Sequence, residues 1–154
     1  MKLQILTSMV AVSALSLATT LMVGKMAKAD NTKFICAKYQ DYPATIAETA
    51  SGKVPVIRWT ADDYFDESGE DALNRCNRVS GVLENLYSDR QFEQDILTDT
   101  HNQIEIVCAV NDRDNSCTLL FGVQPSENAD SLRDSLVEKL QSLAGDRAFT
   151  PLER

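Results

Sequence analysis

The sequence predicts an α+β fold, in which antiparallel hairpins form a sheet and two helices pack on one face of it as a two-layer sandwich. Three observations lead to this class. Short runs alternate apolar and polar residues, two longer runs carry apolar residues at three- and four-residue steps, and clusters of turn formers separate them. No stretch rich in proline or glycine divides the chain after residue 29. We therefore expect a single domain over residues 30–154.

The segment 1–29 has the pattern of a cleaved signal peptide. The run from Ile5 to Gly24 carries no charge, and Ala27-Lys28-Ala29 has the small-x-small pattern that signal peptidase recognises before Asp30. The alternative is a retained N-terminal membrane anchor, because the uncharged run is longer than a usual h-region. Six serine and threonine residues dilute its hydrophobicity, so the sequence favours cleavage.

The charge of the remaining chain excludes one class of partner. Cleavage removes Lys2, Lys25 and Lys28 and leaves 12 basic residues against 23 acidic ones, a formal net charge of −11. Such a surface repels nucleic acid and anionic lipid headgroups. We therefore expect no nucleic-acid binding and no direct insertion of the mature domain in a membrane. The expected partner is an unidentified protein that is basic or membrane-associated.

Strands are predicted in the first part of the domain and again after its centre. The first is the run KFICAKY (33–39). The runs ATIAET (44–49) and VPVIRWT (54–60) flank the turn pair Ser51-Gly52, which predicts a hairpin. A shorter strand is expected at DILT (95–98).

Two helices complete the expected order β-β-β-α-β-β-β-α. The first should run from about Gly69 to Tyr87, because Ser68 and Asp71 form a capping-box-like start. The second lies within 126–145, where Gly145 is a natural C-cap. Both carry an apolar stripe at helical spacing, made of Ala72, Leu73, Cys76, Val79, Leu83 and Leu86 in the first and Leu132, Leu136, Leu140 and Leu143 in the second.

The chain has four cysteines, all after residue 30: Cys36, Cys76, Cys108 and Cys117. An even number in an exported domain favours disulfide bonds, with three possible connectivities. The runs 104–110 and 117–123 flank a cluster of turn formers and predict a hairpin. If Cys108 lies opposite Cys117, both cysteines fall on a wholly apolar face of that hairpin. This register predicts a bond between Cys108 and Cys117.

The remaining bond would join Cys36 to Cys76. Cys76 lies on the apolar stripe of the first helix, and Cys36 shares a strand face with Phe34. Two inward-facing cysteines can tie this strand to this helix. We expect Phe34, Trp59 and Phe121 to anchor the core, because large aromatic side chains contribute most buried area.

The sequence contains no recognisable catalytic or metal-binding motif. His101 is the only histidine, and neither C-x-x-C nor G-x-S-x-G occurs. Counted from Asp112, the calcium-loop pattern requires glycine and glutamate where this chain has Cys117 and Val123. We therefore expect no enzyme, no cofactor and no dedicated metal site. The acidic stretch 62–71 could still attract cations weakly.

Several short motifs follow one another along most of the chain: FIC (34–36), PAT (43–45), VPVIRW (54–59), Phe65, RCNRVS (75–80), IVC (106–108) and CTLLF (117–121). Together they resemble the circadian-oscillating-protein domain found in exported cyanobacterial proteins. Two places depart from that family: EDALNRC lacks a proline before the cysteine, and DTHNQIEIVC lacks a glycine before the strand. Neither departure touches the cysteines. The resemblance implies an extracytoplasmic, membrane-peripheral protein and supplies no catalytic residue.

These observations lead to one function hypothesis and two alternatives. The first is a non-enzymatic binding or accessory domain, stapled by two disulfides, in the periplasm or thylakoid lumen. The second is a carrier of a small ligand or a calcium-like cation that uses the stretch 62–71. The third is an atypical hydrolase, which would have to use His101.

Overall fold

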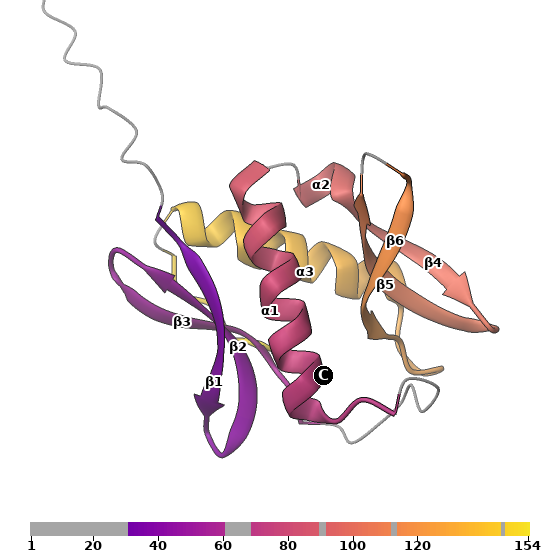
Figure 1. Ribbon diagram of the computed structural model, residues 1–154, viewed down its shortest axis with the longest axis horizontal. Helices are drawn as coiled ribbons and strands as arrows, with labels where there is room; N and C mark the ends of the chain where they lie inside the picture. Colours follow the sequence, from indigo (N-terminus) through magenta and orange to yellow (C-terminus); the bar gives the residue numbers. More distant parts are fainter. Residues whose placement is uncertain (1–30, 61–68, 90–91, 112–113, 146) are drawn as a thin grey trace, which may run out of the picture.

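The structure is a computed structural model that describes residues 31–60, 69–89, 92–111, 114–145 and 147–154 (Figure 1). The expected signal peptide, residues 62–67 of the acidic stretch, Phe65 and Ser68 lie outside these residues. No helix in the described ranges is long and apolar enough to cross a membrane.

The first sheet begins with a meander of three strands, β1 (Lys33–Tyr39), β2 (Tyr42–Thr49) and β3 (Gly52–Arg58). The β1–β2 turn consists of Gln40 and Asp41, both with positive φ, at 47° and 70°. A two-residue turn of this kind matches the twist of the strands and fixes the register, in which Tyr39 pairs with Tyr42.

The second sheet is a meander of β4 (Ile96–His101), β5 (Ile104–Asn111) and β6 (Ser116–Gly122). The turn between β4 and β5 is of the same two-residue kind as the β1–β2 turn, because Asn102 and Gln103 have φ values of 49° and 66°. The predicted short strand at 95–98 is thus the start of the longer strand β4.

Three helices accompany the sheets: α1 (Ala72–Asp89), the four-residue α2 (Phe92–Asp95) and α3 (Ala129–Ala144). α1 begins later than predicted, directly after Asp71. Leu73, expected on the buried stripe of α1, is exposed in its first turn, where Ala72 makes the core contact instead.

The last strand, β7 (Leu152–Glu153), extends the first sheet beside β3 and runs parallel to it. The sequence analysis does not predict β7, because two residues show no alternation. In each half of the chain, a three-stranded meander is followed by a helix that packs on it. α1 contacts β1 and β2, and α3 contacts β4 and β5. We call each meander with its helix a unit.

The α+β class and the antiparallel hairpins are confirmed, but the layers differ from the expected single sheet with two helices on one face. The strands divide into two separate sheets, and α1 and α3 lie between them (Figure 1). Within each meander a strand pairs only with the strands next to it in the sequence, and α1 and α2 separate the two meanders along the chain. Alternation within a strand carries no information on whether β3 pairs with β4, so the sequence alone could not separate the sheets.

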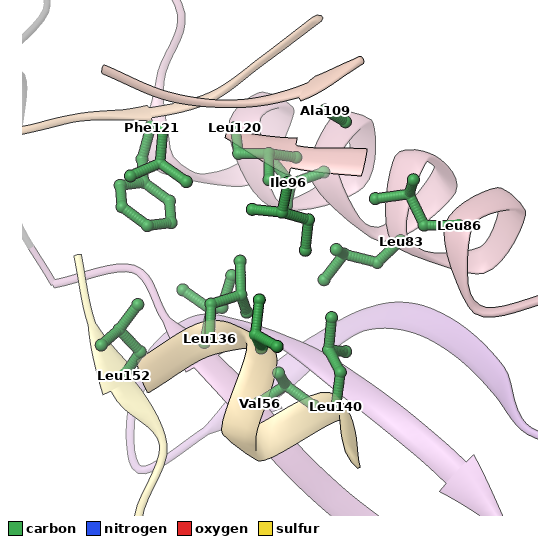
Figure 2. Close-up of a cluster of buried hydrophobic side chains, with 14 of the residues drawn as sticks. Val56, Leu83, Leu86, Ile96, Ala109, Leu120, Phe121, Leu136, Leu140 and Leu152 are labelled. Atoms are coloured by element: carbon green, nitrogen blue, oxygen red, sulfur yellow. The ribbon is translucent and has the colours of Figure 1, made fainter. Parts of the chain in front are cut away.

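The hydrophobic core fills the space between the sheets and helices. Figure 2 shows Ile96, Leu120 and Phe121 of the second sheet facing Leu136 and Leu140 of α3. All five are buried. At roughly 25 cal/mol per Å² of apolar surface, this shared core is the main term that holds the two units together.

Candidate functional site

Cys36 and Cys76 form a disulfide bond that ties β1 to α1. Their sulfur atoms lie 2.05 Å apart and their Cα atoms 5.5 Å apart. Cys76 is wholly buried on the helix stripe, and Cys36 is half-buried. This bond is the one that the sequence analysis expects, and it leaves no thiol at Cys76 for catalysis.

Cys108 and Cys117 form the second bond, within the β5–β6 hairpin. The expected pair is present, but its register differs: Cys117 lies opposite Val110, and Cys108 lies opposite Leu119. The two cysteines are therefore diagonal neighbours. A register shift between Val107 and Cys108 adds a residue to β6 and displaces the pairing.

The prediction for the faces of this hairpin was wrong. Val107 and Ala109 face the shared core, whereas Cys108 lies on the opposite face of the sheet and Cys117 is exposed. The sequence IEIVCAV is apolar on both faces, so hydrophobic alternation could not decide which one is buried. The disulfide staples the outside of the second sheet.

The three expected anchors are buried in the core. Phe34 packs against Tyr87 with ring centroids 5.4 Å apart. The indole N–H of Trp59 donates to the Thr45 hydroxyl at 3.1 Å, which satisfies its one polar group. Phe121 belongs to the same cluster. Trp59 therefore serves as a core residue with a satisfied donor.

Arg78 and the end of the acidic stretch form an ion pair at the start of α1. Nε and Nη2 of Arg78 donate to the Glu70 carboxylate at 2.8–3.1 Å, and Nη1 donates to the Leu119 carbonyl on β6. Asp71 caps α1 by accepting the Asn74 backbone N–H at 2.7 Å. The two described acids of this stretch thus make structural contacts.

Two more sheet edges are closed by charged side chains. Nε of Arg133 on α3 donates to the Ile96 carbonyl at the edge of β4, at 2.8 Å. On β1, the Phe34 backbone N–H donates to the Glu84 carboxylate at 3.3 Å. Charges placed on edge strands prevent other chains from pairing with them.

Arg154 and Glu127 form the most buried ion pair of the described residues. Nη1 and Nη2 of Arg154 donate to the two Glu127 oxygens at 2.8 and 2.9 Å, and Nη2 also donates to the Gly122 carbonyl of β6. The guanidinium lies 5.1 Å from the centroid of the Phe121 ring. The hydrogen bonds from Arg154 hold the pKa of Glu127 below its usual value.

His101 lies exposed at the end of β4, where it pairs with Ile104 across the turn. In the described ranges no three histidine, cysteine or acidic side chains gather in a way that could hold a metal ion.

Depressions in the described surface include one beside the start of α1 and one beside the β2–β3 hairpin. The larger depression has a volume of about 620 Å³ and lies between Glu70, Arg78 and Thr118. Its two charged side chains, Glu70 and Arg78, are paired with each other. The smaller, about 250 Å³, lies between Lys53 of the β2–β3 hairpin and Leu143 of α3. Neither contains a convergent set of unpaired polar groups.

A comparison with known families decides where this chain belongs. The family model described as circadian oscillating protein COP23 matches residues 33–153, from the first residue of β1 to the last of β7. The chain is a member of the COP23 family. No curated protein and no solved structure matches it.

One face of this COP23 domain differs in character from the rest. On the side of the β1–β2–β3 meander that faces away from α1, the register places an apolar centre of Ile35, Ala37, Ala44 and Ile46. Ala44 and Ile46 are buried, and Ile35 and Ala37 are half-buried. Around that centre lie Lys33, Tyr39, Tyr42, Glu48, Lys53 and Arg58, and Glu48 lies opposite both lysines. We call this surface the meander face. Tyr42 is 43% exposed. Among the described residues it is one of three large hydrophobic side chains that are exposed, the others being Leu73 and Leu97.

Proposed function

We propose that this COP23 protein is a non-enzymatic binding or accessory domain that works outside the cytoplasm. The proposal rests on one observation: the cysteines and several arginines of this domain bind other parts of the same chain. All four cysteines are bonded, and Arg78, Arg133 and Arg154 bind carbonyls or carboxylates of other elements. What the domain offers to other molecules is therefore its surface.

The lowered pKa values support this interpretation. Perturbed pKa values are frequent in active sites. Here Asp114 has a lowered pKa because Ser116 hydrogen-bonds to it within the β5–β6 turn, and Glu127 because Arg154 does so. Each shift has a structural cause.

Two disulfides support a non-reducing compartment. Together with the signal-peptide pattern of residues 1–29, they favour the periplasm or thylakoid lumen, with association at a membrane surface. Alkaline phosphatase, which is active only after export, is a suitable reporter. A fusion of residues 1–40 to this enzyme should be active, and a fusion of residues 30–40 should be inactive. Equal activity of both would contradict export.

The binding role is tested separately. Cross-linking in intact cells, followed by capture of the tagged full chain, should yield one protein joined to this domain. The same sample should be screened for hydrolysis of ester, phosphate and peptide substrates. A turnover lost on His101→Ala would contradict the proposal and favour the hydrolase alternative.

A further inference from the structure

The two disulfide bonds of this domain differ in their access to solvent. Cys117 of the β5–β6 hairpin is exposed, whereas its partner Cys108 is only 1% exposed. In the other bond Cys76 is wholly buried and Cys36 is half-buried. A thiol reduces a disulfide when its thiolate attacks one of the two sulfurs, so the rate depends on access to that sulfur. An external thiol therefore reaches the Cys108–Cys117 bond more readily, and it reaches that bond at Cys117.

The β5–β6 hairpin has contacts that do not depend on its disulfide. In the turn, the Asn115 backbone N–H donates to the Asn111 carbonyl at 2.9 Å. Arg78 of α1 donates to a backbone carbonyl of β6, and Leu120 and Phe121 of the same strand are buried in the shared core. The bond can therefore open while the hairpin keeps its turn, its edge contact and its core packing.

We propose that the Cys108–Cys117 bond is a thiol–disulfide exchange site for an external dithiol, with Cys117 as the sulfur that is attacked. One thiolate of the dithiol bonds to Cys117 Sγ, the bond between the two cysteines breaks, and Cys108 leaves as a thiolate that takes up a proton. The second thiol of the reductant then displaces Cys117, which is protonated in turn. The dithiol is oxidised to its disulfide, and the protein receives two electrons and two protons.

This exchange gives the outside of the second sheet two states. In the oxidised state the domain has no free thiol. In the reduced state it lacks the outer staple and carries an exposed thiol at Cys117 that can form a mixed disulfide with another molecule. In a non-reducing compartment both bonds stay closed until a dithiol is supplied. The inference goes beyond the proposed binding role and does not depend on it.

The first test treats the full chain with dithiothreitol in mildly alkaline buffer. Samples are quenched with acid, the free thiols are alkylated, and mass spectrometry of the peptides identifies them. Cys108 and Cys117 should become alkylated at least about tenfold faster than Cys36 and Cys76. Circular dichroism should show a folded domain after the outer bond has opened. In concentrated guanidinium chloride the two bonds should be reduced at similar rates, because unfolding removes the difference in access.

A matched pair of variants tests which sulfur is attacked. C108S leaves only the thiol of Cys117, C117S leaves only the thiol of Cys108, and both variants lack the same bond. With dipyridyl disulfide, C108S should release pyridinethione at least about tenfold faster than C117S, because its thiol is the exposed one. Thermal unfolding of both variants checks that they are folded.

Three results would overturn the inference. The first is reduction of the Cys36–Cys76 bond as fast as, or faster than, that of the outer bond in the folded chain. The second is loss of the circular dichroism signal in step with reduction of the outer bond, since the bond would then open only on unfolding. The third is a Cys108 thiol in C117S that reacts as fast as the Cys117 thiol in C108S. Each of these results would leave the proposed binding function standing.

Discussion

Two buried residues of this protein, Cys76 and Arg154, are held by partners from distant parts of the chain. Cys76 of α1 is bonded to Cys36 of β1, and Arg154 at the end of the described chain binds Glu127 at the start of the α3 region. A buried charge or donor that loses its partner costs more than the pair contributes, because its desolvation is no longer offset. Substitutions at these positions should therefore act on stability.

Cys76→Ser should lower the free energy of unfolding by about 2–5 kcal/mol, because it removes a disulfide and leaves a hydroxyl in the core. Cys36→Ser should cost a similar amount. The double substitution should cost little more than either alone, since both break one bond. Urea unfolding measures all three, and additive losses in the double variant would contradict the assignment.

Cys117→Ser should be milder, at about 3 kcal/mol or less, because that bond spans 9 residues rather than 40 and lies at the exposed side of the sheet. It serves as the comparison for the Cys76 series. If the loss at Cys117 exceeded the loss at Cys76 in the same urea series, the weight given to the β1–α1 bond would be wrong.

The Glu127–Arg154 pair predicts a pH dependence. The folded pKa of Glu127 lies below its ordinary value of 4.5, so the pair contributes its full stability above that value. The contribution is lost as the pH falls through the lowered folded pKa. Glu127→Gln should reduce stability by about 2 kcal/mol at neutral pH. Its urea midpoint should approach that of the wild type in acid, and a constant difference from pH 7 to 3 would contradict this account.

At the level of strands and helices, the main device is the closure of sheet edges by charged side chains. Arg78, Arg133 and Glu84 reach from α1 and α3 to the edges of β6, β4 and β1. These contacts join the helices to the sheets and at the same time block strand pairing with other molecules. The charges therefore contribute both to stability and to solubility.

Arg78→Ala should remove the β6 contact and leave Glu70 without its partner. We expect a loss of about 2–3 kcal/mol and faster self-association on mild heating, followed by light scattering. Lys53→Ala, at an exposed position, is the control and should change stability by less than about 0.5 kcal/mol. Equal behaviour of the two variants would show that the edge contact is unimportant.

The sequence predicted the elements better than their arrangement. Six strands and two helices follow from alternation and helical spacing. The pair Cys36–Cys76 follows from two inward-facing cysteines, whereas the pair Cys108–Cys117 was expected from a hairpin register that the structure does not have. The row of Lys33, Glu48 and Lys53 escaped prediction, because the two lysines lie 20 residues apart in the chain and come to either side of Glu48 only through the β1–β2–β3 register. The role of Arg154 was also hidden, since its partner Glu127 lies 27 residues away.

At the scale of the whole molecule, two meander-helix units share one core and differ in charge. Residues 33–58 of the first unit carry a net charge of +2, and the acidic residues lie mostly in the rest of the chain.

Calcium should have little effect on this molecule, because Glu70 and Asp71 already bind Arg78 and the start of α1. Addition of calcium to about 5 mM should raise the unfolding temperature by less than about 1 °C, since a ligand stabilises only if it binds the native state. Differential scanning fluorimetry of the full chain measures this. A saturable rise of several degrees, absent with magnesium, would favour the cation-carrier alternative.

The proposed function depends on a disulfide-stapled domain that is exported and has no reactive thiol. Mass spectrometry of the protein isolated from its own cells under alkylating conditions tests it most directly, because one sample reports the N-terminus and every cysteine. The account predicts a chain that begins at Asp30, no alkylated cysteine, and peptides that link Cys36 to Cys76 and Cys108 to Cys117. Alkylated cysteines in the native protein, or a link from Cys76 to Cys108 or Cys117, would contradict it.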